Sequence, residues 1–214
     1  NQTGHDNTAI GYSALQACTA SDNTAVGFKA LYSNTTGTYN VGLGRYTLGV
    51  NTTGVRNVAL GNFALNANTT GNYNIGIGHY ALASNTTAER NTAIGYLSQY
   101  LNTTGGSNTS LGNHTLYSNT TGPNNTAIGH EALRVNTTGY DNTAVGVNAV
   151  EHNTTGYRNV GLGMGALYAN TTGHQNISIG YYSLADNTTG GFNIGIGHAA
   201  LNKSTTADDN VAIG

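Results

Sequence analysis

Hydrophobic and polar residues recur along this chain with a period of 17 residues. Residues 40–57 read "NVGLGRYTLGVNTTGVRN", and residues 57–74 read "NVALGNFALNANTTGNYN". Every repeat is numbered here from its leading asparagine, which occupies Asn7, Asn23, Asn40, Asn57, Asn74, Asn91, Asn108, Asn125, Asn142, Asn159, Asn176, Asn193 and Asn210. Every step between these residues is 17 except the first, which is 16. Strict self-similarity at such a period is typical of a solenoid, a propeller or another repeat array.

The apolar positions at the start of the repeat predict a short β-strand. Position 2 is Thr, Val or Ile, and position 3 is Ala, Gly or Ser. Position 4 is always a branched aliphatic residue: Ile10, Val26, Leu43, Leu60, Ile77, Ile94, Leu111, Ile128, Val145, Leu162, Ile179, Ile196 and Ile213. This alternation is typical of a strand with one packed face, and we expect position 4 to point inward. The invariant glycine at position 5 and its β-branched neighbours argue against a helix.

The second half of the repeat predicts another strand and a turn. Position 9 is Leu in all but two coils, where it is Gln99 and Val150. The leucines are Leu15, Leu31, Leu48, Leu65, Leu82, Leu116, Leu133, Leu167, Leu184 and Leu201. We expect it to be the inward residue of a second short strand. Glycine at position 5 supplies a corner that needs a positive φ or leaves no room for a Cβ atom. The sequence "NTTG" at positions 12 to 15 is good turn chemistry.

These features together predict an all-β fold, a parallel β-solenoid or β-roll in which each 17-residue repeat is one coil. Residues 1–214 form one tandem-repeat domain of about thirteen coils, stacked about 4.7–4.9 Å apart. The core is thin, so stability is expected to be a sum of terms between neighbouring coils. The asparagines at positions 1 and 12 should stack on themselves as amide ladders.

The first coil and the chain ends depart from the repeat. In the first coil "QACTASD" stands where other coils have "NTTG", and Cys18 takes the place of the position 12 asparagine. We therefore expect a local irregularity, with the amide ladder beginning only at Asn34. The sequence starts and stops in mid-repeat, which we interpret as a piece of something longer. Exposed strand edges at uncapped ends favour association with further copies of the chain.

Composition narrows the classes of partner. Charged residues make up 7% of the chain, against about 25% in ordinary soluble domains, and the net charge is −2. This balance gives no electrostatic case for nucleic acid. No apolar run approaches the roughly 20 residues that a membrane-spanning helix needs, so no membrane insertion is expected. The single Cys18 excludes an internal disulfide framework and is expected to be a buried thiol.

Motifs that suggest chemistry have simpler interpretations. "GLGMGA", residues 161–166, fits the dinucleotide fingerprint but lacks its strand–helix–strand context, so no cofactor is predicted. His79, His130 and His198 share position 6 on distant coils, whereas His114 and His130 fall on adjacent coils. Exposed surface histidine is the favoured interpretation, and no metal site is predicted. No carboxylate pair or triad recurs, so no catalytic residue is predicted and the chain is expected not to be an enzyme.

Two surface features have a functional alternative. Aromatic residues gather at positions 6, 7 and 10, and are interpreted first as cover for the thin core and second as a surface for carbohydrate. The "NTT" triplet gives an N-glycosylation acceptor at position 12 of ten coils: Asn34, Asn51, Asn68, Asn85, Asn102, Asn119, Asn136, Asn153, Asn170 and Asn187. The same rule is met by Asn1, Asn108, Asn113, Asn124, Asn176 and Asn202. Turn and ladder chemistry explains these asparagines equally well, but a glycan coat would keep an almost uncharged rod soluble.

The unit "NTAIGxxALxxNTTGxxN" resembles tandem repeats of bacterial and phage tail-fibre-like proteins. Its "N-x-[AGS]-[IVL]-G" half is similar to the head repeats of trimeric autotransporter adhesins. The resemblance covers nearly the whole chain and implies a parallel β-roll, often trimeric, in a surface fibre or adhesive head. The period of 17 is longer than that of the adhesin repeat. A second resemblance, of "IGYSAL" to a left-handed hexapeptide helix, covers only one face of each coil.

The sequence therefore predicts a non-enzymatic extracellular structural fibre or adhesin, on a cell or virion surface, with copies of itself as partners. Repetition without a unique constellation of residues builds length and periodic surface, which suit scaffolding and multivalent adhesion. The alternatives are a binding module for a regular ligand such as glycan or ice, a phage tail-fibre receptor-binding segment, or a polysaccharide hydrolase. Adjacent "TT" residues must point in different directions, which weakens the ice-binding alternative.

Overall fold

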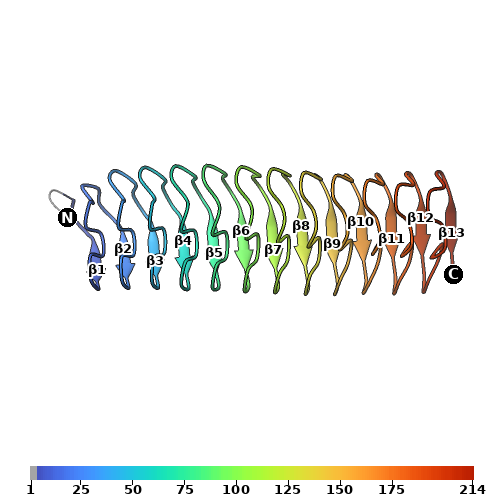
Figure 1. Ribbon diagram of the computed structural model, residues 1–214, viewed down its shortest axis with the longest axis horizontal. Coiled ribbons are helices and arrows are strands. Elements are labelled where there is room, and N and C mark those ends of the chain that lie inside the picture. The colour runs from blue at the N-terminus through green and yellow to red at the C-terminus, as the bar shows by residue number, and fades with distance from the viewer. Residues whose placement is uncertain (1–3) are drawn as a thin grey trace.

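The computed structural model describes residues 4–214 as a rod of stacked coils with one β-strand in each repeat (Figure 1). The strands are β1 (Thr8–Ile10), β2 (Thr24–Val26), β3 (Val41–Leu43), β4 (Val58–Leu60), β5 (Ile75–Ile77), β6 (Thr92–Ile94), β7 (Thr109–Leu111), β8 (Thr126–Ile128), β9 (Thr143–Val145), β10 (Val160–Leu162), β11 (Ile177–Ile179), β12 (Ile194–Ile196) and β13 (Val211–Ile213). They form a single 13-stranded sheet in chain order. The predicted all-β parallel solenoid is confirmed. Residues 4–214 contain no helix that could cross a membrane.

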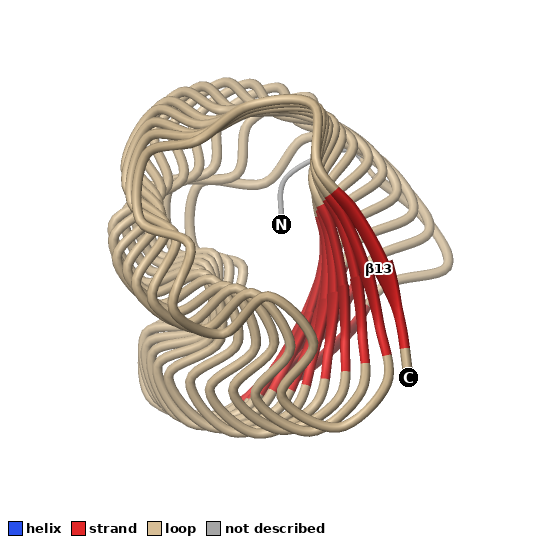
Figure 2. Cartoon of the chain, turned by 90° about the vertical axis from the view of Figure 1, so that its right-hand side faces the viewer, coloured by secondary structure: helices blue, strands red, loops and turns tan. Residues whose placement is uncertain are grey.

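The sheet is parallel and keeps the register of the repeat throughout. Val58 pairs with Ile75, one repeat further on, and the same positions face each other in every other pair. The short first coil enters this register without disturbing it, because Thr8 still pairs with Thr24. Viewed along the rod, the strands make one wall and turns make the others (Figure 2). The predicted irregularity of the first coil is thus confined to its turn.

The orientation of the strands differs from the prediction. Position 3 points inward and position 4 outward: Ala59 is fully buried, whereas Leu60 is half-exposed. The interior is narrow because the position 9 leucine of the preceding coil already fills it. A Cβ atom added to Gly42 at position 3 would lie 2.9 Å from Oγ1 of Thr47 and 3.6 Å from Cδ1 of Leu31. Only Ala, Gly or Ser fits there, and the prediction that position 4 is inward was wrong.

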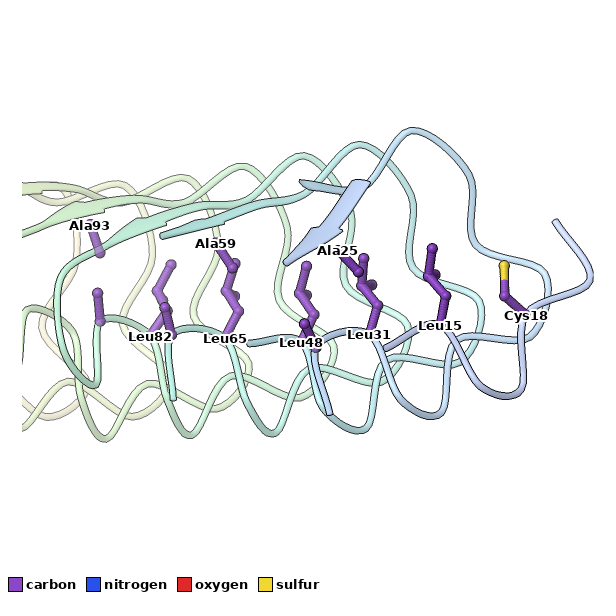
Figure 3. Packing of buried hydrophobic residues seen from close by; sticks show 12 residues of the cluster. Leu15, Cys18, Ala25, Leu31, Leu48, Ala59, Leu65, Leu82 and Ala93 are labelled. Atoms are coloured by element: carbon purple, nitrogen blue, oxygen red, sulfur yellow. The ribbon is translucent and has the colours of Figure 1, made fainter. Parts of the chain in front are cut away.

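Position 9 is inward as predicted, but it is not part of a second strand. Leu31, Leu48 and Leu65 are fully buried and form a single row along the axis (Figure 3). Positions 6 to 11 are a run of turns in which the residues at positions 7 and 9 have positive φ, as in Leu31 at 50°. Each left-handed residue costs about 1–2 kcal/mol. The cost is offset by hydrogen bonds between coils, such as the one that the Leu31 N–H donates to the Thr47 carbonyl at 2.9 Å.

The glycine at position 5 is required for both reasons that the sequence suggested. Gly27 has a φ of 136°, and a Cβ atom added to it would lie 2.5 Å from the carbonyl oxygen of Gly44 in the next coil. Since every coil except the last repeats this contact, no larger side chain fits at this corner within the rod.

Buried amides run along the interior as predicted. At position 12, Nδ2 of Asn51 donates to Oδ1 of Asn34 at 2.8 Å and to the Gly54 carbonyl of its own turn at 3.0 Å. The ladder begins at Asn34, whose Nδ2 lies 3.5 Å from Sγ of buried Cys18. It ends at Asn187, whose Oδ1 has no hydrogen-bond partner among the described residues. At both ends of the ladder, the residue at position 12 of the adjoining coil is not asparagine.

The asparagines at position 1 form a second, different ladder. Oδ1 of Asn23 accepts the backbone N–H of Asn40 at 3.0 Å. Nδ2 of Asn40 donates to the Gly54 carbonyl, at position 15 of the same repeat, at 2.8 Å. This carbonyl is the same one that Asn51 uses, so the two ladders meet at position 15. Each coil is thereby tied to the next through buried side chains as well as through backbone.

A polar cluster interrupts the apolar core near the middle of the rod. One apolar cluster includes residues from Leu15 to Ala93, and the next starts at Leu116. Between them, Nε2 of buried Gln99 donates to Oγ of Ser110 at 2.8 Å, and Ser110 lies 2.6 Å from Oγ of Ser98. Oε1 of Gln99 is buried and has no hydrogen-bond partner within residues 4–214. A buried unpaired carbonyl of this kind is a local loss of stability.

Substitution of an asparagine should destabilise the protein most when it lies in the middle of the amide ladder. We expect Asn119→Ala to lower the free energy of unfolding by about 3 kcal/mol, because it leaves Oδ1 of Asn102 without a donor and removes an acceptor from Asn136. Asn187→Ala should cost about 1–2 kcal/mol less, since its Oδ1 accepts no hydrogen bond. Chemical denaturation of both variants measures the difference, and equal losses would show that the ladder is not continuous.

Replacing the polar cluster should stabilise the rod. The triple variant Ser98→Ala, Gln99→Leu, Ser110→Ala installs the residue types that Ala81, Leu82 and Ala93 supply one coil earlier. We expect a gain of about 1–3 kcal/mol in the free energy of unfolding, because the buried unpaired Oε1 is removed. Gln99→Ala is the control and should lower stability by leaving a cavity. A lower melting temperature for the triple variant would contradict this account.

Candidate interaction surface

The outer side of the sheet is a continuous uncharged face, aliphatic at position 4 and aliphatic or threonine at position 2. We call it the sheet face and define it as positions 2 and 4 of all thirteen strands, none of which is buried. Side chains near its middle are well exposed, with Leu111 at 46% and Ile128 at 36%. The face contains only Thr, Val, Ile and Leu. At the usual strand spacing it is roughly 60 Å long, larger than the apolar patches of most monomeric proteins.

Charged residues are excluded from this face. None of the 7 basic and 9 acidic residues occupies positions 2 to 4 of any repeat. They lie on the turn walls instead, as Arg56 and Arg90 do at position 17. A rod exposed to water on all sides has no reason to keep charge off one wall. The segregation therefore makes the sheet face a candidate contact surface.

The predicted glycan acceptors at position 12 do not lie on a surface. All ten residues, Asn34, Asn51, Asn68, Asn85, Asn102, Asn119, Asn136, Asn153, Asn170 and Asn187, are fully buried. Their Nδ2 atoms, to which a sugar would be attached, are bound in the interior ladder; Nδ2 of Asn136, for example, donates to Oδ1 of Asn119 at 2.8 Å. The folded coil leaves no room for a glycan at these positions. The structure argues against the predicted line of sugars and explains "NTT" as ladder and turn chemistry.

The remaining acceptors differ in exposure. Asn113 and Asn124 are exposed, Asn202 is half-buried, and Asn108 and Asn176 are fully buried in the position 1 ladder. Asn1 lies outside the described residues. The two exposed acceptors are at positions 6 and 17 of one repeat, 108–124, outside the sheet face. Nothing in the "N-x-T" pattern itself separates them from the buried ones.

Aromatic rings stack along a turn wall, as the first interpretation predicted. The ring of Tyr46 stacks on Phe63 with centroids 5.5 Å apart, and Phe63 stacks on Tyr80 at 5.1 Å. Tyr12 and Phe28 begin the same row at 5.4 Å. Most rings of the row stack face to face, and Phe28 meets Tyr46 edge to face, so neighbouring rings cover much of one another. A carbohydrate would need free ring faces, which this row does not offer along its length.

Position 17 carries a second row in which cations and rings alternate. The guanidinium of Arg56 lies 5.5 Å from the ring centroids of both Tyr39 and Tyr73, and its Nη1 donates to Oη of Tyr73 at 2.8 Å. The ring of Tyr73 also lies 6.0 Å from the guanidinium of Arg90. These contacts between coils stabilise the outer wall and take up much of its charge.

One carboxylate is buried and fully engaged. Glu151 accepts from Nη2 of Arg134 at 2.7 Å and from Nδ2 of Asn148. The hydrogen bond with Glu151 is the main reason that the pKa of Arg134 is raised above its ordinary value. Burial is the main reason that the pKa of nearby Tyr168 is raised. Glu151 is a structural residue of the stack rather than an acid or base free to act on a substrate.

The dinucleotide fingerprint is part of the solenoid. Gly161 is the middle residue of β10, where an added Cβ atom would lie 2.5 Å from Cγ2 of Val150, and Ala166 is buried in the interior. Gly161, which has no side chain, thus makes room for the β-branched side chain of Val150 in the preceding coil. Residues 4–214 enclose no pocket. Comparison of the chain with protein-family models, with curated proteins and with solved structures gives no significant match.

Burial should decide which acceptors carry sugar. If the chain is produced in a secretory host that glycosylates "N-x-T", we expect occupied sites at Asn113 and Asn124 and bare amides at position 12, because folded position 12 amides are inaccessible. Glycopeptide mass spectrometry distinguishes the sites. Occupied Asn102 or Asn119 in folded protein would contradict the buried ladder.

Proposed function

We propose that this chain is a non-enzymatic structural segment of an extracellular fibre or adhesin, in which copies of the rod associate through the sheet face. The observation that carries the proposal is the segregation of aliphatic side chains on this one face, from which all charged residues are excluded. A fibre built from several rods is the arrangement that puts such a face out of water.

The energetics favour a second copy as the occupant. Complete burial of one Val, Leu or Ile side chain contributes about 1.5–3 kcal/mol, so a few well-covered strands offset the roughly 4–15 kcal/mol that association costs. Two copies present rows with an identical spacing, so side chains can interdigitate along the whole length. A net charge of −2 adds little repulsion between chains.

The other surfaces support an inert rod more than a ligand-binding module. In each "NTT" the first hydroxyl is bound within the stack, as in the bond from Oγ1 of Thr52 to the Thr69 carbonyl at 3.1 Å. The second threonine, such as Thr53, is exposed in every "NTT", which gives one row of free hydroxyls at this turn rather than a two-row array for ice. The resemblance to tail-fibre and adhesin-head repeats favours the surface of a cell or virion as the location.

Charges placed on the sheet face should separate the chains. We expect the wild-type protein to sediment as an oligomer, and the double variant Leu111→Lys, Ile128→Lys to sediment as a folded monomer, because each copy would bring two unpaired ammonium groups into the contact. The matched control is Val50→Lys, Leu101→Lys, which changes two exposed apolar residues at position 11 on a turn wall and should leave the oligomer intact.

Analytical ultracentrifugation compares the wild-type protein with the two variants at about 1–100 micromolar protein, a range around typical dissociation constants. Circular dichroism verifies that each variant keeps its fold. A wild-type protein that stays monomeric throughout this range contradicts the proposal. Dissociation caused equally by the position 11 variant would place the contact elsewhere on the rod.

A further inference from the structure

Stacking brings three metal-binding side chains together on two adjacent coils. His114 is at position 7 of one coil, and His130 and Glu131 are at positions 6 and 7 of the next. One ring nitrogen of each histidine and one carboxylate oxygen of Glu131 all lie within 4.8 Å of one another. His130 is exposed, whereas His114 and Glu131 are half-buried. The group is therefore open to solvent on one side and supported by the wall of the rod on the other.

One ring nitrogen of His114 is not used by any other described group. Its Nδ1 is buried and has no hydrogen-bond partner among residues 4–214. Its ring packs against the edges of Tyr96, at a centroid distance of 5.5 Å, and Tyr117, at 5.6 Å. These rings limit the rotation of His114. A buried ring nitrogen without a partner is costly, and a metal ion is a group that could satisfy it.

Glu131 is held in place with ligand capacity to spare. Its Oε2 accepts from Nδ2 of Asn148 at 3.2 Å and lies 3.7 Å from Nε of Arg134. Both contacts use Oε2, so the carboxylate keeps a second oxygen for a metal. Arg134 does not leave the region positively charged, because it is paired with Glu151 at 2.7 Å. Two carboxylates and one guanidinium place a net negative charge beside the two histidines.

We propose that His114, His130 and Glu131 bind a divalent transition-metal ion of the zinc type. Two imidazoles and one carboxylate are a ligand set suited to zinc, whereas calcium and magnesium prefer oxygen ligands alone. Ligand atoms around tetrahedral zinc lie about 3.3 Å apart, so the group must close by about 1.5 Å at most. Rotation of the exposed His130 side chain supplies this movement. The ion would join two coils near the middle of the rod and keep one coordination position open.

The other histidines at position 6 provide matched controls. His198 stacks on the ring of Tyr181 at a centroid distance of 5.3 Å, and it belongs to no group of three metal-binding side chains among the described residues. His198→Asn therefore changes the same position of the coil as His130→Asn without touching the proposed site. Asparagine already occupies position 6 at Asn62 and Asn113, so both substitutions are compatible with the fold.

Calorimetric titration of the chelator-treated full chain with zinc chloride tests the site. We expect one zinc ion per chain, with an affinity that His130→Asn and Glu131→Gln each lower at least tenfold and that His198→Asn leaves unchanged. Titration with Co²⁺ gives a second readout, because the intensity of its visible absorption reports the coordination number. His130→Asn should abolish the spectrum of the bound ion, and His198→Asn should preserve it.

Two results would overturn the proposal. One is the absence of saturable zinc or cobalt binding by the folded wild-type chain. The other is an equal loss of affinity in His198→Asn and His130→Asn, which would indicate dispersed surface histidines rather than one site. Far-ultraviolet circular dichroism of each variant separates loss of metal binding from loss of the fold.

Discussion

Hydrogen bonds between buried asparagine side chains hold each coil of this rod in register with the next. A buried amide is costly unless all of its polar atoms are paired, and here the partners are supplied by the same residue one coil away. The carbonyl of Gly54 shows how tightly the parts are linked, since it accepts from both Asn40 and Asn51. A change of one residue in the length of a middle coil would leave several of these groups unpaired. The constant period of 17 follows from this requirement.

The amide ladders also explain why the rod has an apolar exterior. Asparagines and a single row of leucines take up the interior, and the remaining width admits only Ala, Gly or Ser from the strand. The branched residues at positions 2 and 4, which are aliphatic or threonine, are left outside. In an ordinary globular domain these residues would form the core. Here they form a wall, which is a stable arrangement once another surface covers it.

Residues that depart from the repeat lie where the packing and hydrogen bonding of the stack change. Cys18 and Ser204 take the position 12 line at its two ends, beyond which the ladder does not continue. Gln99 and Ser110 divide the apolar interior, and Val150 fits only because position 161 is glycine. His114, His130 and Glu131 gather where two coils differ from the others on an outer wall. Sites with distinctive chemistry arise at such departures, because identical coils give residues at equivalent positions the same surroundings.

The sequence by itself determined the coil, its period, the inward row of leucines and the amide ladder that starts at Asn34. In-register stacking places each residue on its own copy, so repetition along the chain becomes a contact in space. Tertiary structure alone decided which side of the three-residue strand faces inward. Alternation distinguishes positions 2 and 4 from position 3, but only the width left beside Leu31 shows that position 3 must be the inner one.

The remaining differences between the predicted and the observed structure also depend on contacts between coils. Left-handed residues replace the second predicted strand because hydrogen bonds to neighbouring coils offset their local strain, and local sequence preferences do not include such bonds. An acceptor motif does not reveal whether its amide is inside or outside the coil, so burial alone separates Asn119 from Asn113. The adjacency of His114 and His130 was visible in the repeat register. Their convergence with Glu131 depends on side-chain directions that only the stacked coils establish.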